Sequence, residues 1–107
     1  MKSKTYWFVT GMRGPIKIDQ QKVPDFDHKR CYGFFVDFSE ANQAVINNDG
    51  DMYEHEYEYV VIEEHYEGFA SGVGSEQHWY KYNYLTNKFD HIAIPTWAGN
   101  IVHWGIG

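Results

Sequence analysis

The sequence predicts an α+β fold, with a mainly antiparallel, twisted sheet of about five or six strands and one helix packed on a face. Three observations lead to this prediction. Aromatic residues, which favour strands and bury a large area each, make up 19% of the chain. Several stretches alternate with the period of two that a strand requires. A single stretch, residues 39–48, has small apolar residues at helical spacing.

The helix is expected over residues 39–48, in the middle of the chain. Ser39 is a suitable N-cap because its hydroxyl can accept a hydrogen bond from a free amide of the first turn. Glu40 is favourable beside the positive helix end, and residues 47–50 tolerate the left-handed conformation that ends a helix. The face expected to pack on the sheet consists of Ala41, Ala44, Val45 and Asn48.

Strands are expected on both sides of this helix and towards both ends of the chain. Residues 53–64 alternate with period two, and their second half is apolar on both faces, so residues 57–64 should form an inner strand. Residues 5–11 are also apolar on both faces and should be central in the sheet. The other expected elements are a polar edge strand at 16–23, a strand at 30–38, a hairpin of 78–84 with 89–94 that turns at Asn87, a short helical turn at 96–102, and an apolar end at 103–107 packed against the body.

Size and composition indicate one cytoplasmic domain covering residues 1–107. A chain of 107 residues can bury a single modest core. It has no apolar run near the roughly twenty residues that span a membrane, and its basic start lacks the pattern of a signal peptide. The lone Cys31 cannot form an internal disulfide, as expected in a reducing compartment.

Charge is divided unevenly along the chain, although the total is only −6. Residues 1–31 carry +4, residues 32–77 carry −11 without a single Lys or Arg, and residues 78–107 carry +1. A net-acidic chain without a basic stripe is a poor binder of nucleic acid. The acidic block suits either a solvated face that keeps the protein soluble or a surface that engages a basic partner.

Within this block, one acidic strip is the strongest candidate site. Glu54, Glu56 and Glu58 would share one face of the strand at 53–64, with side chains about 7 Å apart. That spacing is similar to the spacing of phosphates along a nucleic-acid strand. We therefore expect a strip that binds a basic protein surface. Its residues are Asp49, Asp51, Glu54, Glu56 and Glu58.

An aromatic, Arg-bearing pocket is the alternative candidate site. A nucleotide base stacks on aromatic rings, and an Arg guanidinium pairs with phosphate. The simpler interpretation is that these aromatic residues are core. The candidate ligand-binding residues are Arg13, Arg30, Tyr80 and Trp104.

No catalytic, metal or cofactor motif is complete. The glycines around Arg13 match neither a P-loop nor a dinucleotide fingerprint. Residues 47–58 are similar to a calcium loop but have Met52 where that loop needs glycine. The histidines lack the spacing of a zinc site, although residues 63–65 and 90–91 could meet across a sheet. We therefore expect a non-enzymatic protein without a metal or cofactor.

The chain also resembles a family of small uncharacterised proteins found in bacterial genomes, phages and prophages. The residues that carry the resemblance are 35–45, 59–64 (YVVIEE) with Gly68, 79–81 (WYK) with Pro95, and the ending 101–107 (IVHWGIG), within a span of 31–107. The resemblance implies a mobile-element context. Small acidic proteins of that context are often anti-defence factors, either anti-CRISPR-like proteins that occupy a nucleic-acid channel or sponges for a signalling nucleotide.

Two functions follow as expectations. The first is an inhibitor of a bacterial defence system, whose acidic surface binds a basic protein such as a nucleic-acid-binding defence effector. The second is a sponge that sequesters a nucleotide in the aromatic pocket and can be a homo-oligomer. In both cases we expect action in the host bacterial cytosol, without direct contact to nucleic acid or membrane.

Overall fold

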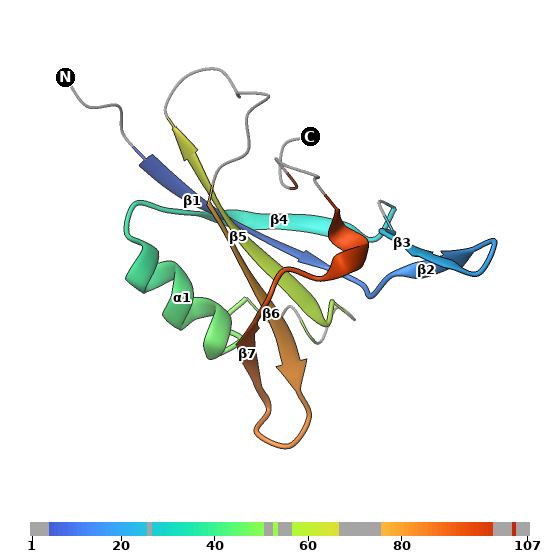
Figure 1. Ribbon diagram of the computed structural model, residues 1–107. Coiled ribbons are helices and arrows are strands. Elements are labelled where there is room, and N and C mark those ends of the chain that lie inside the picture. The colour runs from blue at the N-terminus through green and yellow to red at the C-terminus, as the bar shows by residue number, and fades with distance from the viewer. Residues whose placement is uncertain are drawn as a thin grey trace.

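The structure is an antiparallel sheet with one helix packed on a face (Figure 1), which confirms the predicted α+β fold. The computed structural model describes residues 5–25, 27–50, 53, 57–66, 76–99 and 104. The elements are β1 (Thr5–Met12), β2 (Ile16–Ile18), β3 (Gln21–Val23), β4 (Lys29–Phe35), α1 (Phe38–Ile46), β5 (Tyr59–Tyr66), β6 (Gln77–Asn83), β7 (Lys88–Ile92) and the 3-10 helix η2 (Thr96–Ala98). Five strands pair in the order β4-β1-β5-β6-β7, and β2 pairs with β3 in a separate sheet.

The centre of the sheet is the pair β1 and β5, as the two-sided apolarity of both strands predicts. They pair over eight residues, from Thr5 opposite Tyr66 to Met12 opposite Tyr59. Three consecutive residues of β5, Val60, Val61 and Ile62, are 0% exposed. The expected inner strand is therefore confirmed, but β5 begins at Tyr59 and does not extend back to residue 53. It begins there because β1 ends at Met12, so no β1 residue remains to pair with earlier residues.

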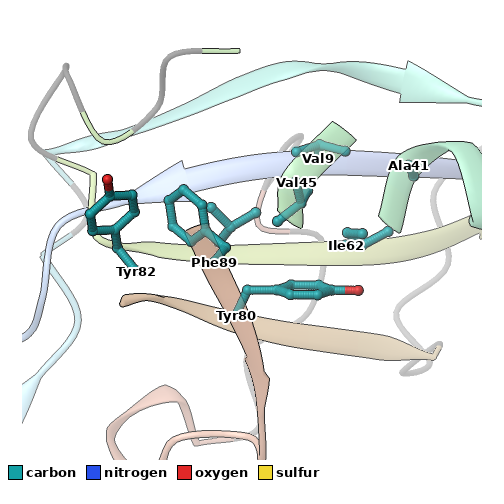
Figure 2. Packing of buried hydrophobic residues seen from close by; sticks show 8 residues of the cluster. Val9, Ala41, Val45, Ile62, Tyr80, Tyr82 and Phe89 are labelled. Atoms are coloured by element: carbon teal, nitrogen blue, oxygen red, sulfur yellow. The ribbon is translucent and has the colours of Figure 1, made fainter. Parts of the chain in front are cut away.

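Buried residues form one cluster on each face of the sheet. The cluster on the α1 face consists of Val9, Ala41, Val45, Val60, Ile62, Tyr80, Tyr82 and Phe89 (Figure 2). The cluster on the opposite face consists of Met12, Val61, Trp79, Ala98 and Trp104. Since neighbours along a strand point to opposite faces, Trp79 and Tyr80 belong to different clusters. Helix α1 covers the first cluster, and η2 covers part of the second.

Helix α1 begins at Phe38, one residue before the predicted range, and its N-cap is Asp37, where Ser39 was predicted. The Asp37 Oδ1 accepts a hydrogen bond from the Ser39 backbone amide at 2.9 Å. Phe38 is therefore helical, and β4 ends at Phe35 instead of continuing to residue 38. The predicted packing face is confirmed at Ala41 and Val45, which are both 0% exposed.

The polar segment 16–23 forms two short strands, so the prediction of one continuous edge strand is wrong. β2 and β3 pair with each other as a hairpin. Its two turn residues, Asp19 and Gln20, have φ values of 50° and 69°. Two consecutive positive φ values make the primed type of turn that closes a tight hairpin. The dipeptide Asp-Gln lacks the glycine that usually signals such a turn, so the turn was not recognised in the sequence.

The second half of the chain follows its prediction closely. β6 and β7 form the expected hairpin, and Asn87 has the expected positive φ of 57°. The predicted helical turn is confirmed over Thr96–Ala98. Trp104 is 2% exposed, which confirms the packed chain end at that residue. The other residues of the predicted apolar end lie outside the described part of the structure.

The cap of α1 gives the first testable prediction. Asp37→Ala removes the acceptor of the Ser39 amide, so the free energy of unfolding should fall by about 1 kcal/mol. Ser39→Ala is the matched control, because the exposed Ser39 side chain does not cap the helix, and it should change stability by less than about 0.5 kcal/mol. Urea unfolding followed by circular dichroism measures both. A larger loss for Ser39→Ala than for Asp37→Ala would restore Ser39 as the cap.

Candidate functional site: a tyrosine-lined cleft with two carboxylates

A cleft of about 670 Å³ opens where the chain leaves β1. The connection from β1 to β2 forms one wall, and residues just before β5 and just after β6 form another. The lining residues are Arg13, Gly14, Pro15, Ile16, Asp25, Tyr53, Glu58 and Tyr84. The cleft therefore combines an arginine, two carboxylates and two tyrosines.

Gly14 lets the carboxylate of Glu58 lie close to the backbone of the β1–β2 connection. A Cβ atom at Gly14 would come within 2.9 Å of the Glu58 Oε1, a distance that real Cβ contacts do not show. The Glu58 carbonyl oxygen accepts a hydrogen bond from the Tyr82 amide at 2.9 Å, which fixes the backbone just before β5. The Glu58 backbone is thus fixed by β6, and its carboxylate lies against Gly14 on the lining of the cleft.

Two tyrosines, Tyr53 and Tyr84, line the cleft, and the buried Tyr82 packs against both of their rings. The rings of Tyr53 and Tyr82 are stacked, with centroids 3.8 Å apart and planes 6° from parallel. Tyr84 lies edge-on to both rings, with each centroid 5.5 Å away. Tyr84 is 60% exposed and therefore presents much of its ring to an incoming group. The accessible ring of the cleft is therefore that of Tyr84.

Negative charge predominates in the cleft. The Tyr84 hydroxyl donates a hydrogen bond to the Glu58 Oε2 at 3.2 Å, and the charge of Glu58 is the main cause that raises the pKa of Tyr84. Asp25 lies 2.7 Å from the His28 Nδ1 through its Oδ2. Against these two carboxylates the lining holds one guanidinium, Arg13. The cleft is suited to a cationic group more than to an anion.

The structure separates the predicted acidic strip into parts. Glu58 lies in the cleft, in the segment before β5 and not on a strand face. Asp49 is exposed beyond the end of α1 and lines a second cavity, of about 210 Å³, whose other walls include Val9, Tyr32 and Val45. Asp51, Glu54 and Glu56 lie outside the described residues. Of the strip, the structure therefore assigns only Glu58 to the cleft.

Of the four predicted ligand-binding residues, only Arg13 lines the cleft. Arg30 is on β4, with its guanidinium carbon 5.0 Å from the centre of the Tyr32 ring. Tyr80 and Trp104 are 0% and 2% exposed, and they pack on opposite faces of the sheet. The Tyr80 hydroxyl donates to the Asn42 Oδ1 at 2.6 Å, which ties β6 to α1. These three residues do not form a common pocket with Arg13.

Sequence reasoning missed the roles of Tyr53, Tyr84 and Asp25. Tyr84 is the first residue of the β6–β7 turn, and its place next to the predicted turn was the one available signal that its ring is exposed. Asp25 follows Pro24 in a loop and carries no pattern of its own. These residues meet only because the β1–β2 connection and the β6–β7 hairpin lie at the same end of the sheet.

Sequence reasoning also missed a buried polar chain on the face opposite α1. Glu63 is 0% exposed, and its Oε2 accepts a hydrogen bond from the Gln77 Nε2 at 3.2 Å. Gln77 in turn accepts from the Trp79 Nε1 at 3.1 Å. In the sequence, Glu63 was indistinguishable from the acids around it. Within the ranges that the structure describes, no three His, Cys, Asp or Glu side chains gather as metal ligands would.

Fold and cleft together define a small α+β protein with an open cleft of tyrosines and carboxylates. Comparisons of the chain with models of protein families, with curated proteins and with solved structures found no significant match. Among the helices in the described ranges, none is both long and apolar enough to cross a membrane. Function is therefore inferred from the cleft itself.

The buried hydroxyl of Tyr80 predicts how the free energy of unfolding changes at alkaline pH. Burial raises the pKa of Tyr80 to about 12, from an ordinary 10.0. Between these values the folded protein keeps a proton that the unfolded chain has lost. The stabilisation is therefore complete below pH 10 and is lost as the pH rises towards 12. Urea unfolding should show a decline of at most about 1.4 kcal/mol per pH unit from this group.

Tyr80→Phe is the matched variant, because it keeps the ring and removes the titrating hydroxyl. It should cost roughly 1 kcal/mol near pH 8, where the Asn42 contact is lost, and should flatten the decline above pH 10. The residual decline should come from Tyr32, Tyr66 and Tyr84, whose pKa values are also raised. Equal slopes in both proteins would exclude Tyr80 as the titrating group.

Proposed function

We propose that this protein is a non-enzymatic binding protein that uses its acidic, tyrosine-lined cleft to dock on a basic surface of a partner protein. The observation that carries the proposal is the exposed ring of Tyr84 beside the carboxylate of Glu58. The hydroxyl of Tyr84 and the oxygen of Glu58 are 3.2 Å apart. An arginine or lysine side chain can lie on such a ring and pair with such a carboxylate at the same time.

The hydrogen bond from Tyr84 orients Glu58 before any partner arrives. A preformed carboxylate loses little conformational entropy on binding, which strengthens each contact that it makes. Asp25 places a second carboxylate on the lining, but its Oδ1 accepts from the Asp27 amide and its Oδ2 lies 2.7 Å from the His28 Nδ1, so Glu58 is the main acceptor for a basic side chain. Arg13 limits the net negative charge and disfavours a purely electrostatic, unselective attraction.

The wider charge distribution supports the same kind of partner. Eleven acidic residues and no Lys or Arg occur between Tyr32 and Gln77, a stretch that includes Glu58. A field of one sign increases the rate at which an oppositely charged surface arrives in the correct orientation. Asp49, Asp51, Glu54 and Glu56, the remaining members of the predicted strip, would contribute to this steering.

The biological setting that we propose is the bacterial cytosol during infection by a phage or another mobile element. It rests on the family resemblance in residues 31–107. A basic surface that normally holds nucleic acid is the natural target of a small acidic protein, because carboxylates can replace phosphates there. The proposed role is thus an anti-CRISPR-like inhibitor that occupies the nucleic-acid site of a defence effector.

The docking proposal predicts binding of a basic peptide at the cleft. The probe is a fluorescein-labelled peptide with lysine and arginine at alternate positions, measured by fluorescence anisotropy. Glu58→Gln keeps an oxygen that can accept from Tyr84 but removes the charge, so affinity should fall about fivefold. Binding should also weaken between about 50 mM and about 300 mM salt, because added salt screens the attraction.

Glu76→Gln is the matched control. It removes the same charge from an exposed residue at the far end of β5, where the Glu76 carbonyl pairs with the Glu64 amide. It should leave affinity within about twofold of the parent protein. Equal losses for Glu58→Gln and Glu76→Gln would mean that the acidic block is only a solubilising face. A peptide of alternating glutamate should not bind.

The second candidate function is nucleotide binding, which the position of Arg13 beside Tyr53 and Tyr84 favours. A base could stack on the exposed ring while the guanidinium holds a phosphate. Arg13→Ala should then lower affinity by about ten- to a hundredfold. Calorimetry with a panel of cyclic nucleotides measures this. Absence of heat with the parent protein would eliminate the sponge, and binding unaffected by Arg13→Ala would place the nucleotide elsewhere.

A further inference from the structure

The hairpin of β2 and β3 projects beyond the five-stranded sheet as an arm (Figure 1). Its cross-strand pairs are Ile16 with Val23, Lys17 with Lys22, and Ile18 with Gln21. Because side chains alternate along a strand, the two lysines share one face of the arm and the apolar residues share the other. Ile16 and Ile18 remain 43% and 54% exposed. The arm is therefore amphipathic and largely uncovered.

Such an arm is poorly stabilised by its own contacts. A two-stranded hairpin has marginal stability in water by itself, and like charges directly opposite each other weaken strand pairing. Lys17 and Lys22 are directly opposite each other. A partner surface with carboxylates would relieve this repulsion, and its apolar or aromatic groups would cover the isoleucines. Carboxylates and aromatic rings would therefore stabilise the arm, and the cleft contains both.

We propose that the arm of one copy of this chain lies in the cleft of a second copy, and that the exchange is reciprocal. This inference rests on the proposed function, because it names a second copy as one basic partner of the same cleft. Lys17 and Lys22 would approach Glu58 and Asp25 of the second copy, while Ile18 would lie on the exposed ring of its Tyr84.

Geometry favours a reciprocal exchange. Arg13, Gly14, Pro15 and Ile16 both line the cleft and form the base of the arm, so arm and cleft are contiguous. A twofold axis close to this base would bring each arm to the other copy's cleft at once, which closes the assembly as a dimer. Ile16 at the base of the arm already lines the cleft of its own chain, whereas the hairpin beyond it projects from the five-stranded sheet and is free to meet a second copy.

Charge complementarity favours a second copy over other partners. The arm carries two lysines against one acid, Asp19, whereas residues 32–77 carry −11. The arm is short, so the buried area should lie at the low end for protein interfaces. We therefore expect a weak dimer, with a dissociation constant of the order of 100 µM. The attraction should decrease as salt rises.

Sedimentation equilibrium of the full chain over a concentration series up to about 0.5 mM tests the dimer. Lys17→Glu combined with Lys22→Glu should weaken dimerisation at least about tenfold. Lys81→Glu combined with Lys88→Glu makes the same charge change on β6 and β7, away from the arm, and should leave dimerisation within about twofold. Equal effects of the two double variants would overturn the arm as the contact.

A charge exchange provides a sharper test. Glu58→Lys should be monomeric, because a basic arm then meets a basic cleft, and the Lys17→Glu, Lys22→Glu variant should be monomeric because both surfaces are acidic. Mixed together they should form a heterodimer, since each arm then meets a cleft of opposite charge. Native mass spectrometry distinguishes the species. A mixture that stays monomeric would overturn the proposal, while circular dichroism verifies that each variant is folded.

The lysine/arginine peptide separates the failure of this inference from the failure of the proposed function. Peptide binding that depends on Glu58, by a chain that stays monomeric throughout the concentration series, would overturn the dimer and leave the proposed function standing. Absence of both peptide binding and dimerisation would overturn the dimer and the proposed function together. If both occur, the peptide should dissociate the dimer, because the peptide and the arm occupy the same cleft. A dimer that persists at saturating peptide would place the dimer contact elsewhere.

Discussion

The pairing of β1 with β5 is the constraint on which the rest of the structure depends. These strands form the middle of the sheet, and their side chains supply both buried clusters. Two-sided burial requires a cover on each face, which α1 provides on one side and η2 with Trp104 on the other. Because a one-residue shift would exchange the faces of every side chain, the observed register, from Thr5 opposite Tyr66 to Met12 opposite Tyr59, decides which residues belong to each cluster.

The functional cleft is a consequence of where this central pair ends. β1 stops at Met12, and residues 13–15 carry the chain away into the hairpin arm. At Glu58, β5 has lost its partner on the β1 side, so the Glu58 side chain lines the cleft, while its carbonyl still accepts from the Tyr82 amide of β6. Gly14 lets the carboxylate lie close to the chain there, since a Cβ atom at this position would come within 2.9 Å of the Glu58 Oε1 and the side chain would have to shift. The arm and the cleft share this origin, which is why they lie side by side.

A group of contacting tyrosine rings extends from the buried core to the exposed lining of the cleft. Tyr82 is 7% exposed and packs with Phe89, whereas Tyr84, two residues further, is 60% exposed. Tyr53 connects the two, stacked on one and edge-on to the other. An aromatic ring with a hydroxyl can bury its body and still present a polar atom at the rim. The cleft is thereby anchored directly to the cluster beneath α1.

The sequence by itself determined the elements whose signals are local. The alternation around Val60, the small face of Ala41 and Val45, and the turn at Asn87 each depend on neighbours along the chain, and each prediction was confirmed. Tertiary structure alone decided what depends on distant partners. The start of β5 depends on where β1 ends, and the Tyr84–Glu58 contact joins residues 26 apart in sequence. The hairpin at 16–23 was hidden for a different reason, because positive φ at Asp19 and Gln20 is uncommon for residues with a side chain and is imposed by closure of the turn.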